Sequence, residues 1–227
     1  MKKKAVFCME NSPENKIILY HGSEKILKTP EFGKGEINND YGQGFYCTKN
    51  KGLAGEWAVL WTGKDGYINE YSFDCTGLKI LYLNQMPVEH WIAILLKNRK
   101  ISSLDDFELR INAFLQKYLV DTSDYDVIEG WRADDAFFSY ITDFVTDTLS
   151  LENLSLALKF GDLRNQVFLK SKKAFEILEY RTHHPAPASR FLKSARDRDK
   201  KAKQDYINMR GRAIGTRIIA LVGEENF

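Results

Sequence analysis

Short apolar runs separated by polar and glycine-rich turns mark the first half of the chain. Residues 17–20 form a β-branched and aromatic run that ends at His21-Gly22-Ser23, which predicts a buried strand opening into a turn. The polar stretch over residues 24–43 predicts a loop, with room for one short strand. Residues 45–48 predict a second strand. Along residues 67–73 two sets of side chains alternate, as they do on the two faces of a strand, so a third strand is expected there.

Apolar residues at helical spacing follow the second predicted strand and recur later in the chain. Residues 53–61 predict an amphipathic helix, in which Trp57 and Trp61 lie four positions apart and are expected in the core. Two helices are expected between residues 88 and 119. Further helices are predicted over residues 137–149 and 151–160, and further strands over residues 78–83, 126–128 and 166–169. Gly130 is expected to end the strand over residues 126–128.

The order of these elements predicts the fold class. Strands and helices interleave without a repeating strand-helix-strand rhythm, which favours an α+β fold over a doubly wound sheet. The segment His183-His184-Pro185-Ala186-Pro187 is expected to break regular structure and to mark a boundary. We therefore expect one domain over residues 1–187 and a basic, helical C-terminal extension over residues 188–227, packed on the domain or appended to it.

Charge is distributed unevenly along the chain. The formal net charge is only +2, but Lys and Arg residues crowd the segment from Arg181 to Arg217. Such asymmetry points to a polyanionic partner or to a solvated helix face, and the sequence leaves both open.

Cysteines, histidines and hydropathy exclude several classes of protein. The three cysteines lack paired spacing, so neither a disulfide framework nor a zinc site is expected, and a reducing, cytoplasmic compartment fits best. The adjacent His183 and His184 are expected to be ordinary polar residues rather than metal ligands. The apolar run after Lys2-Lys3-Lys4 is too short for a signal peptide, and no stretch approaches the roughly 18 apolar residues of a membrane helix.

Three segments resemble, in content and order, the motifs of the ADP-ribosyltransferase superfamily. They are Leu19-Tyr20-His21-Gly22-Ser23, the stretch from Asp40 to Thr48 with sequence DYGQGFYCT, and Asn165-Gln166-Val167-Phe168. Residues 127–130 and Ala133-Asp134-Asp135 also resemble segments of a bacterial family of transferase-like domains. The resemblance covers residues 17–180 and implies a split β-sheet core with flanking and inserted helices.

The chemistry of nicotinamide release explains why these residue types would be needed. Breaking the bond between nicotinamide and ribose develops positive charge on the sugar. The site must therefore bind the nicotinamide amide, bind the ribose diol and stabilise the cationic sugar. A histidine at a strand end can bond a ribose hydroxyl, a glycine leaves its main chain open to the carboxamide, and a tyrosine ring can stack. The resemblance implies these roles for His21, Gly22 and Tyr46, and adds Ser23 and Asp40 to the cofactor-binding set.

Gln166 is the main departure from the superfamily pattern, because many members carry glutamate at this position. A neutral amide bonds a hydroxyl more weakly than a carboxylate, and a loss of about 1–2 kcal/mol would slow the reaction roughly ten- to thirty-fold. A nearby carboxylate would compensate, and Asp134 and Asp135 are the candidates. These two residues fit the N-terminus of a helix equally well. The expected catalytic set is therefore Gln166, Tyr46, Asp134 and Asp135.

The resemblance implies an NAD-dependent mono-ADP-ribosyltransferase of bacterial character, with NAD as its cofactor, no metal, and a protein or nucleic acid as acceptor. Likeness to bacterial transferases suggests a toxin or defence role. Three alternatives stay open: a protein that binds NAD without turnover, an NAD glycohydrolase, and a nucleic-acid-binding module that uses the basic C-terminal segment. Taken singly, His21 fits a structural histidine and Tyr46 a core residue of a strand.

Overall fold

The computed structural model describes residues 16–133, 135–160, 165–209 and 215–223 and shows a mixed α+β fold. The strands are β1 (Lys16–Ser23), β2 (Phe45–Cys47), β3 (Gly66–Asp74), β4 (Ile80–Tyr82), β5 (Val127–Trp131), β6 (Asn165–Leu169) and β7 (Leu178–Ala186). The α-helices are α1 (Lys51–Leu60), α2 (Val88–Asn98), α3 (Glu108–Tyr118), α4 (Asp135–Val145), α5 (Leu151–Phe160), α6 (Lys172–Glu176), α7 (Ala188–Met209) and α8 (Ile218–Val222). The 3-10 helices η1 (Leu83–Gln85) and η2 (Ser102–Phe107) flank α2 in the chain.

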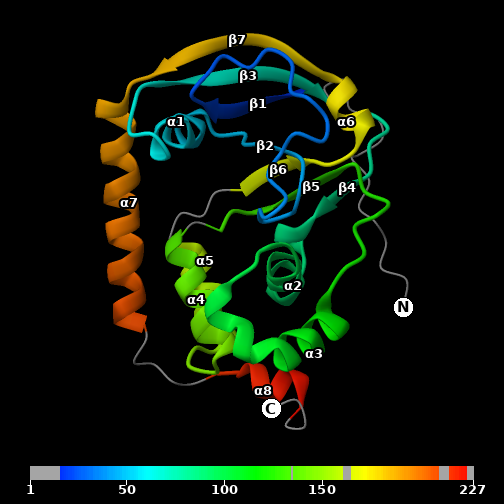
Figure 1. Cartoon of the computed structure of the whole chain (residues 1–227), viewed down its shortest axis with the longest axis vertical. Helices are drawn as coiled ribbons and strands as arrows, with labels where there is room; N and C mark the ends of the chain where they lie inside the picture. The colour runs from blue at the N-terminus through cyan, green and yellow to red at the C-terminus, as the bar shows by residue number, and fades with distance from the viewer. Residues whose placement is uncertain (1–15, 134, 161–164, 210–214, 224–227) are drawn as a thin grey trace.

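The strands form two sheets that meet at one point. One sheet has the order β1-β3-β7 and is antiparallel, and the other has the order β2-β6-β5-β4, in which β4 and β5 pair in parallel. The sheets are joined where Tyr20 of β1 and Thr48 just after β2 exchange two main-chain hydrogen bonds of 2.8 and 2.9 Å. Figure 1 shows β1 on the side of the upper sheet that faces β2 of the lower sheet.

Helix α2 occupies the centre of the larger core. Its residues Trp91–Leu96 are all buried, as expected for a helix that is apolar on every side. It lies among α3, α4 and β4 in Figure 1, and it packs with buried residues of α4 such as Ile141 and Phe144. This core supports the sheet that contains β2 and β6.

Helix α7 is fastened to α1 and to the turn after it. The Ala188 N–H donates to Asp65 Oδ1 over 2.8 Å at the start of α7, and Phe191 lies so close to Gly55 that an added Cβ would be 2.3 Å from its ring. Figure 1 shows α7 running beside the molecule from the end of β7 towards the helical half. The basic C-terminal segment thus begins as a helix packed on α1.

Two expectations about local structure are wrong. The segment over residues 183–187 does not break regular structure, because β7 continues to Ala186 and Pro185 pairs with Tyr67. Proline is tolerated there because β7 is an edge strand. Gly130 lies inside β5 rather than ending it, and an added Cβ would be 2.4 Å from the Tyr41 hydroxyl, so packing explains this glycine.

Within the described residues, no helix combines the length and the apolar character that a membrane span needs.

Candidate functional site

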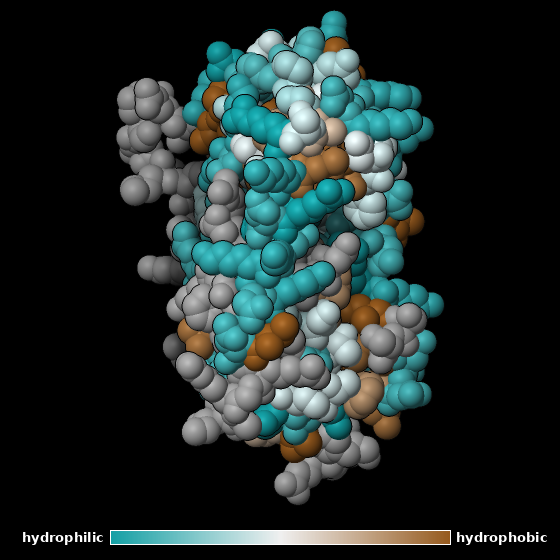
Figure 2. All heavy atoms as spheres, turned by 90° about the vertical axis from the view of Figure 1, so that its left-hand side faces the viewer, coloured by the Kyte–Doolittle hydropathy of each residue, from teal (hydrophilic) through white to brown (hydrophobic). Residues whose placement is uncertain are grey.

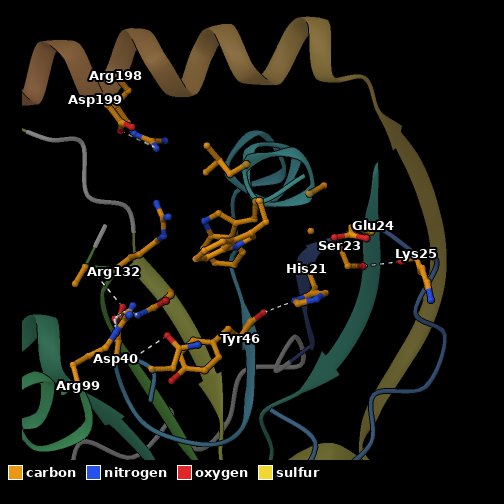
Figure 3. A pocket seen from close by; sticks show the side chains of 18 residues that line it. His21, Ser23, Glu24, Lys25, Asp40, Tyr46, Arg99, Arg132, Arg198 and Asp199 are labelled. Atoms are coloured by element: carbon orange, nitrogen blue, oxygen red, sulfur yellow. Dashed lines mark hydrogen bonds and ion pairs between the residues drawn. The ribbon is translucent and has the colours of Figure 1, made fainter. Parts of the chain in front are cut away.

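A cleft of about 640 Å³ opens where the two sheets separate. Residues of β1, the loop before β2, β2, α1, the segment after β5, β6 and α7 line it. Figure 3 shows His21 and Ser23 at one end, Arg99 and Arg132 at the other, and Arg198 reaching in from α7. The volume falls in the range of about 300–1,000 Å³ that is typical of sites for cofactors and other small molecules.

The cleft begins at an interruption of the main-chain ladder between β1 and β2. Tyr20 and Thr48 form a hydrogen-bonded antiparallel pair, so Gly22 and Tyr46 would form the next one if the ladder continued. Instead, the Tyr46 carbonyl lies 2.7 Å from Nδ1 of His21. The N–H and C=O of Gly22 face the same edge as those of Tyr20, and no described strand pairs with Gly22 there.

Gly22 is also required by the packing of α1 on β1. An added Cβ would lie 1.8 Å from the Ala54 carbonyl oxygen and 2.6 Å from the Ala58 nitrogen, distances that real Cβ atoms do not show. The absence of a side chain therefore lets α1 approach β1 closely. The same residue lines the cleft with the edge of β1 that carries its main-chain donor and acceptor.

His21 is held as a neutral imidazole at the edge of the cleft. Because its Nδ1 faces a carbonyl, that nitrogen carries the proton, and Nε2 is an acceptor. Burial lowers the pKa of His21 below its usual value of 6.5, although the hydrogen bond to the Tyr46 carbonyl acts in the opposite direction. The ring also packs against Phe45, with centroids 4.5 Å apart. His21 can therefore accept a hydrogen bond from a hydroxyl in the cleft.

Tyr46 is a fixed aromatic wall. Its hydroxyl donates to the Gly42 carbonyl over 2.7 Å and accepts from the Tyr41 N–H over 3.0 Å, while its ring packs against Phe168 with centroids 4.8 Å apart. Burial raises the pKa of Tyr46 far above its usual value of 10.0, so the phenol stays protonated. Tyr46 can therefore supply an aromatic surface for stacking but does not act as a general base.

Asp40 is a buried carboxylate whose lone pairs are all directed at donors. Arg99 donates to Oδ1 from Nε and Nη2 over 3.1 and 2.9 Å. The Ala133 N–H and Gln166 Nε2 donate to Oδ2 over 3.0 and 2.8 Å. Asp40 is only 2% exposed, so these four bonds replace the water that the charge loses on folding.

The orientation of the Gln166 amide follows from its two neighbours. Asp40 Oδ2 and the Trp131 carbonyl, 3.3 Å away, are both acceptors, so the NH₂ group must face them. The amide oxygen Oε1 is then the atom that can accept a hydrogen bond from a hydroxyl. Gln166 is buried in β6 and still lines the cleft.

The carboxylate beside Gln166 is Asp40, which comes from the loop before β2. The sequence had favoured Asp134 and Asp135 for this place. Asp134 lies outside the described residues, and Asp135 is the first residue of α4, with its side chain outside the described part of the structure. Ser23 lines the cleft near His21, where its hydroxyl donates to the Lys25 carbonyl and accepts from Asn69.

Trp57 and Trp61 line the cleft instead of the core, which corrects the expectation for α1. Trp61 is 89% exposed, and the Arg132 guanidinium lies 5.6 Å from the centre of the Trp57 ring. Smaller residues of α1, Leu53, Ala54, Ala58 and Val59, fill the core side of this helix. Their i, i+4 spacing places both rings on one face of α1, but it does not tell whether that face packs in the core or lines a cleft.

Sequence reasoning missed three arginines of the cleft, Arg99, Arg132 and Arg198, which come from separate segments. Arg198 of α7 forms an ion pair with Glu56 of α1 at the edge of the cleft. Nothing in their local sequence distinguishes these arginines from other surface cations. Among the described residues, no group of three or more His, Cys, Asp and Glu side chains is placed to hold a metal ion.

Comparison with known families places the chain in one family. A family described as "Protein of unknown function (DUF3990)" matches residues 17–180, and the chain belongs to this family. No curated protein and no solved structure matches the chain significantly. The match includes His21, Tyr46 and Gln166, whereas α7 with Arg198 follows it.

Proposed function

We propose that the cleft binds NAD and that the protein is a mono-ADP-ribosyltransferase that acts on a macromolecular acceptor. One observation supports this most: His21, Gly22, Tyr46 and Gln166, which the resemblance to ADP-ribosyltransferases implies as site residues, line one cleft of about 640 Å³. They come from β1, β2 and β6, so their meeting is a property of the folded chain.

The residues at the separation of β1 and β2 fit the nicotinamide riboside half of NAD. The N–H and C=O of Gly22, with which no described strand pairs on this edge, match the acceptor and donor of a carboxamide. The rings of Tyr46 and Trp57 can flank a flat heterocycle. His21 Nε2 and Gln166 Oε1 are acceptors for ribose hydroxyls. Positively charged side chains elsewhere in the cleft suit a pyrophosphate.

When bound, NAD supplies a glycosidic bond whose cleavage releases neutral nicotinamide, while the acceptor bonds to the ribose carbon and gives up a proton. The chain's own residues hold and orient the reacting sugar. Gln166 is fixed by Asp40, so its Oε1 is positioned before any ligand arrives. The neutral Gln166 predicts slow turnover compared with a site that carries a carboxylate there.

A second candidate function is binding of NAD without turnover. It is favoured by the engagement of the Gln166 NH₂ group with Asp40 and Trp131, which makes this position a structural link as well as a site residue. It differs from the first in one measurable product, because only a transferase or glycohydrolase releases nicotinamide.

The testing experiment incubates NAD labelled in its adenine half with the protein and with cell extract, and measures both free nicotinamide and labelled macromolecules. We expect release and labelling by the wild type and at least a tenfold loss with His21→Ala and Gln166→Ala. Glu31→Ala, a change in an exposed ion pair, serves as the control that keeps wild-type activity.

The reaction products distinguish the candidate functions. Nicotinamide release without labelled macromolecules would assign a glycohydrolase, and saturable NAD binding without release would assign the binding protein. Equal labelling by the wild type, His21→Ala and Gln166→Ala would refute the roles proposed for these two residues.

A further inference from the structure

Helix α7 carries an unusual share of the positive charge of the protein. It contains seven Lys and Arg residues and three Asp residues, a net charge of +4, whereas the whole chain has a net charge of +2. The remaining chain is therefore net acidic. A charge imbalance of this kind localises attraction for a polyanion to one face of a protein.

Four of these cations form a continuous exposed stripe along α7. Lys193, Arg196, Lys200 and Lys203 follow the spacing i, i+3, i+7, i+10, which places them on one side of a helix, and all four are exposed. The helix buries a different side, through Ala188, Phe191 and Ala195. Among the ion pairs of the described residues, none engages a residue of this cationic stripe.

The stripe is rigidly placed beside the cleft. Arg198 and Asp199 of α7 line the cleft, and Arg198 pairs with Glu56 of α1, which ties α7 to the helix that carries Trp57. Figure 2 shows the side of the molecule along which α7 runs, where hydrophilic side chains gather. Arg196 and Lys203 lie three residues before and four residues after Asp199, so the stripe runs next to the part of α7 that lines the cleft.

Trp61 supplies a second, independent feature at the same opening. This large aromatic side chain is 89% exposed, although it lines the cleft, and it stands at the C-terminal end of α1. An exposed indole ring is a platform on which a nucleic acid base can stack. Positive charge that follows a backbone, together with an exposed ring, is the arrangement by which proteins bind single strands.

We propose that the cationic stripe and Trp61 form a binding surface for single-stranded nucleic acid. Resting on the proposed function, the bound strand is the acceptor of ADP-ribose. The stripe spans ten residues of helix, about 15 Å at 1.5 Å per residue, and its four cations can neutralise four phosphates of one strand. A duplex would keep its bases stacked on one another and away from Trp61.

Binding is measured by fluorescence anisotropy of a labelled single-stranded oligonucleotide with the full chain, without NAD, over a series of salt concentrations. If four phosphates are neutralised, the logarithm of the binding constant should fall with the logarithm of salt with a slope of about −2.8. A matched duplex serves as the competing probe. We expect it to bind at least tenfold more weakly than the single strand.

Two variants separate the contribution of the cationic stripe to binding from that of the Trp61 ring. Changing Lys193, Arg196, Lys200 and Lys203 together to Gln should reduce the magnitude of the slope by about 2.8 and weaken binding at low salt at least a hundredfold. The matched control changes the exposed Lys16, Lys28, Lys34 and Lys172 to Gln, which alters net charge equally, and should weaken binding less than threefold. Trp61→Ala should weaken binding about 5- to 150-fold with an unchanged salt slope.

Transfer is tested with the same oligonucleotide and labelled NAD. The stripe variant should release nicotinamide at the wild-type rate, while labelling of the oligonucleotide falls at least tenfold. Nicotinamide release by a wild type that neither binds nor labels the oligonucleotide would overturn this inference and leave the proposed function standing. Equal weakening by the stripe variant and its control, or a preference for the duplex, would also overturn it.

Discussion

Gln166 Nε2 donates a hydrogen bond of 2.8 Å to Asp40 Oδ2, which joins β6 to the loop before β2 across 126 positions of the chain. Under the proposed function, this bond accounts for a glutamine at the position where the resemblance to ADP-ribosyltransferases implies a glutamate. Asp40 already supplies the carboxylate, and Arg99 neutralises its other oxygen. A second carboxylate at position 166 would meet two acceptors and no donor among these neighbours.

We predict that Gln166→Glu destabilises the protein and does not increase nicotinamide release. Repulsion from Asp40 would raise the pKa of the new carboxyl group, so ionising it at neutral pH costs stability. The free energy of unfolding should fall by about 1–3 kcal/mol at pH 7. A raised pKa means that the folded state binds the proton more tightly, so the deficit should shrink as the pH falls.

Chemical denaturation at pH 7 and pH 5 checks this prediction. Gln204→Glu, which makes the same change on the exposed side of α7, should stay within about 0.5 kcal/mol of the wild type. A Gln166→Glu variant that matched the wild type at both pH values would show that Asp40 does not select the amide.

Removing the Asp40 carboxylate should destabilise the fold more than any exposed ion pair does. Asp40→Ala would leave the Ala133 N–H, Gln166 and the partly buried Arg99 without their acceptor. We expect a loss of about 3 kcal/mol in the free energy of unfolding, measured by urea denaturation. The exposed pair of Glu31 with Lys34 provides the control, since Glu31→Ala should cost less than about 0.5 kcal/mol.

Gly22→Ala tests the close approach of α1 to β1. The new methyl group would lie 1.8 Å from the Ala54 carbonyl oxygen, so the helix must move away from the strand. We expect thermal unfolding to report a loss of about 3 kcal/mol. Gly52→Ala is the matched substitution, because it lies in an exposed part of α1 and should hold or raise stability by helix propensity. Similar results for both variants would contradict the packing described.

The lowered pKa of His21 predicts a stability that depends on pH. Because burial makes the folded protein bind the His21 proton less tightly than the unfolded chain, this contribution is present above about pH 6.5 and is lost as the pH falls below it. The free energy of unfolding should decline by up to about 1.4 kcal/mol per pH unit from this group. In His21→Gln that part of the slope should vanish, and an unchanged slope would place the neutral imidazole in doubt.

Local patterns were enough to predict most elements of the fold. The apolar run over residues 17–20 lies in β1, the periodicity over residues 151–160 matches α5, and the α+β class followed from their order. These features depend on neighbouring residues and so are visible in a window of the sequence. The segment over residues 183–187 was mistaken because its prolines suggest a break, while the edge position that tolerates Pro185 is a property of the sheet.

The candidate site could be predicted only where a motif carried it. His21, Tyr46 and Gln166 stood in recognisable segments, and all three line the cleft. The link between Asp40 and Gln166 could not be predicted, because two residues so distant in sequence share no periodic signal. The places of Trp57 and Arg198 depended on how α1 and α7 pack, which the sequence of either helix alone does not specify.

The most direct test of the account is a calorimetric titration of the full chain with NAD. We predict saturable binding at one site per chain, weakened at least tenfold by His21→Ala and unchanged by Glu31→Ala, with free nicotinamide competing for the same site. Absence of heat at millimolar NAD, or binding that His21→Ala leaves unaltered, would contradict the claim that this cleft holds the dinucleotide.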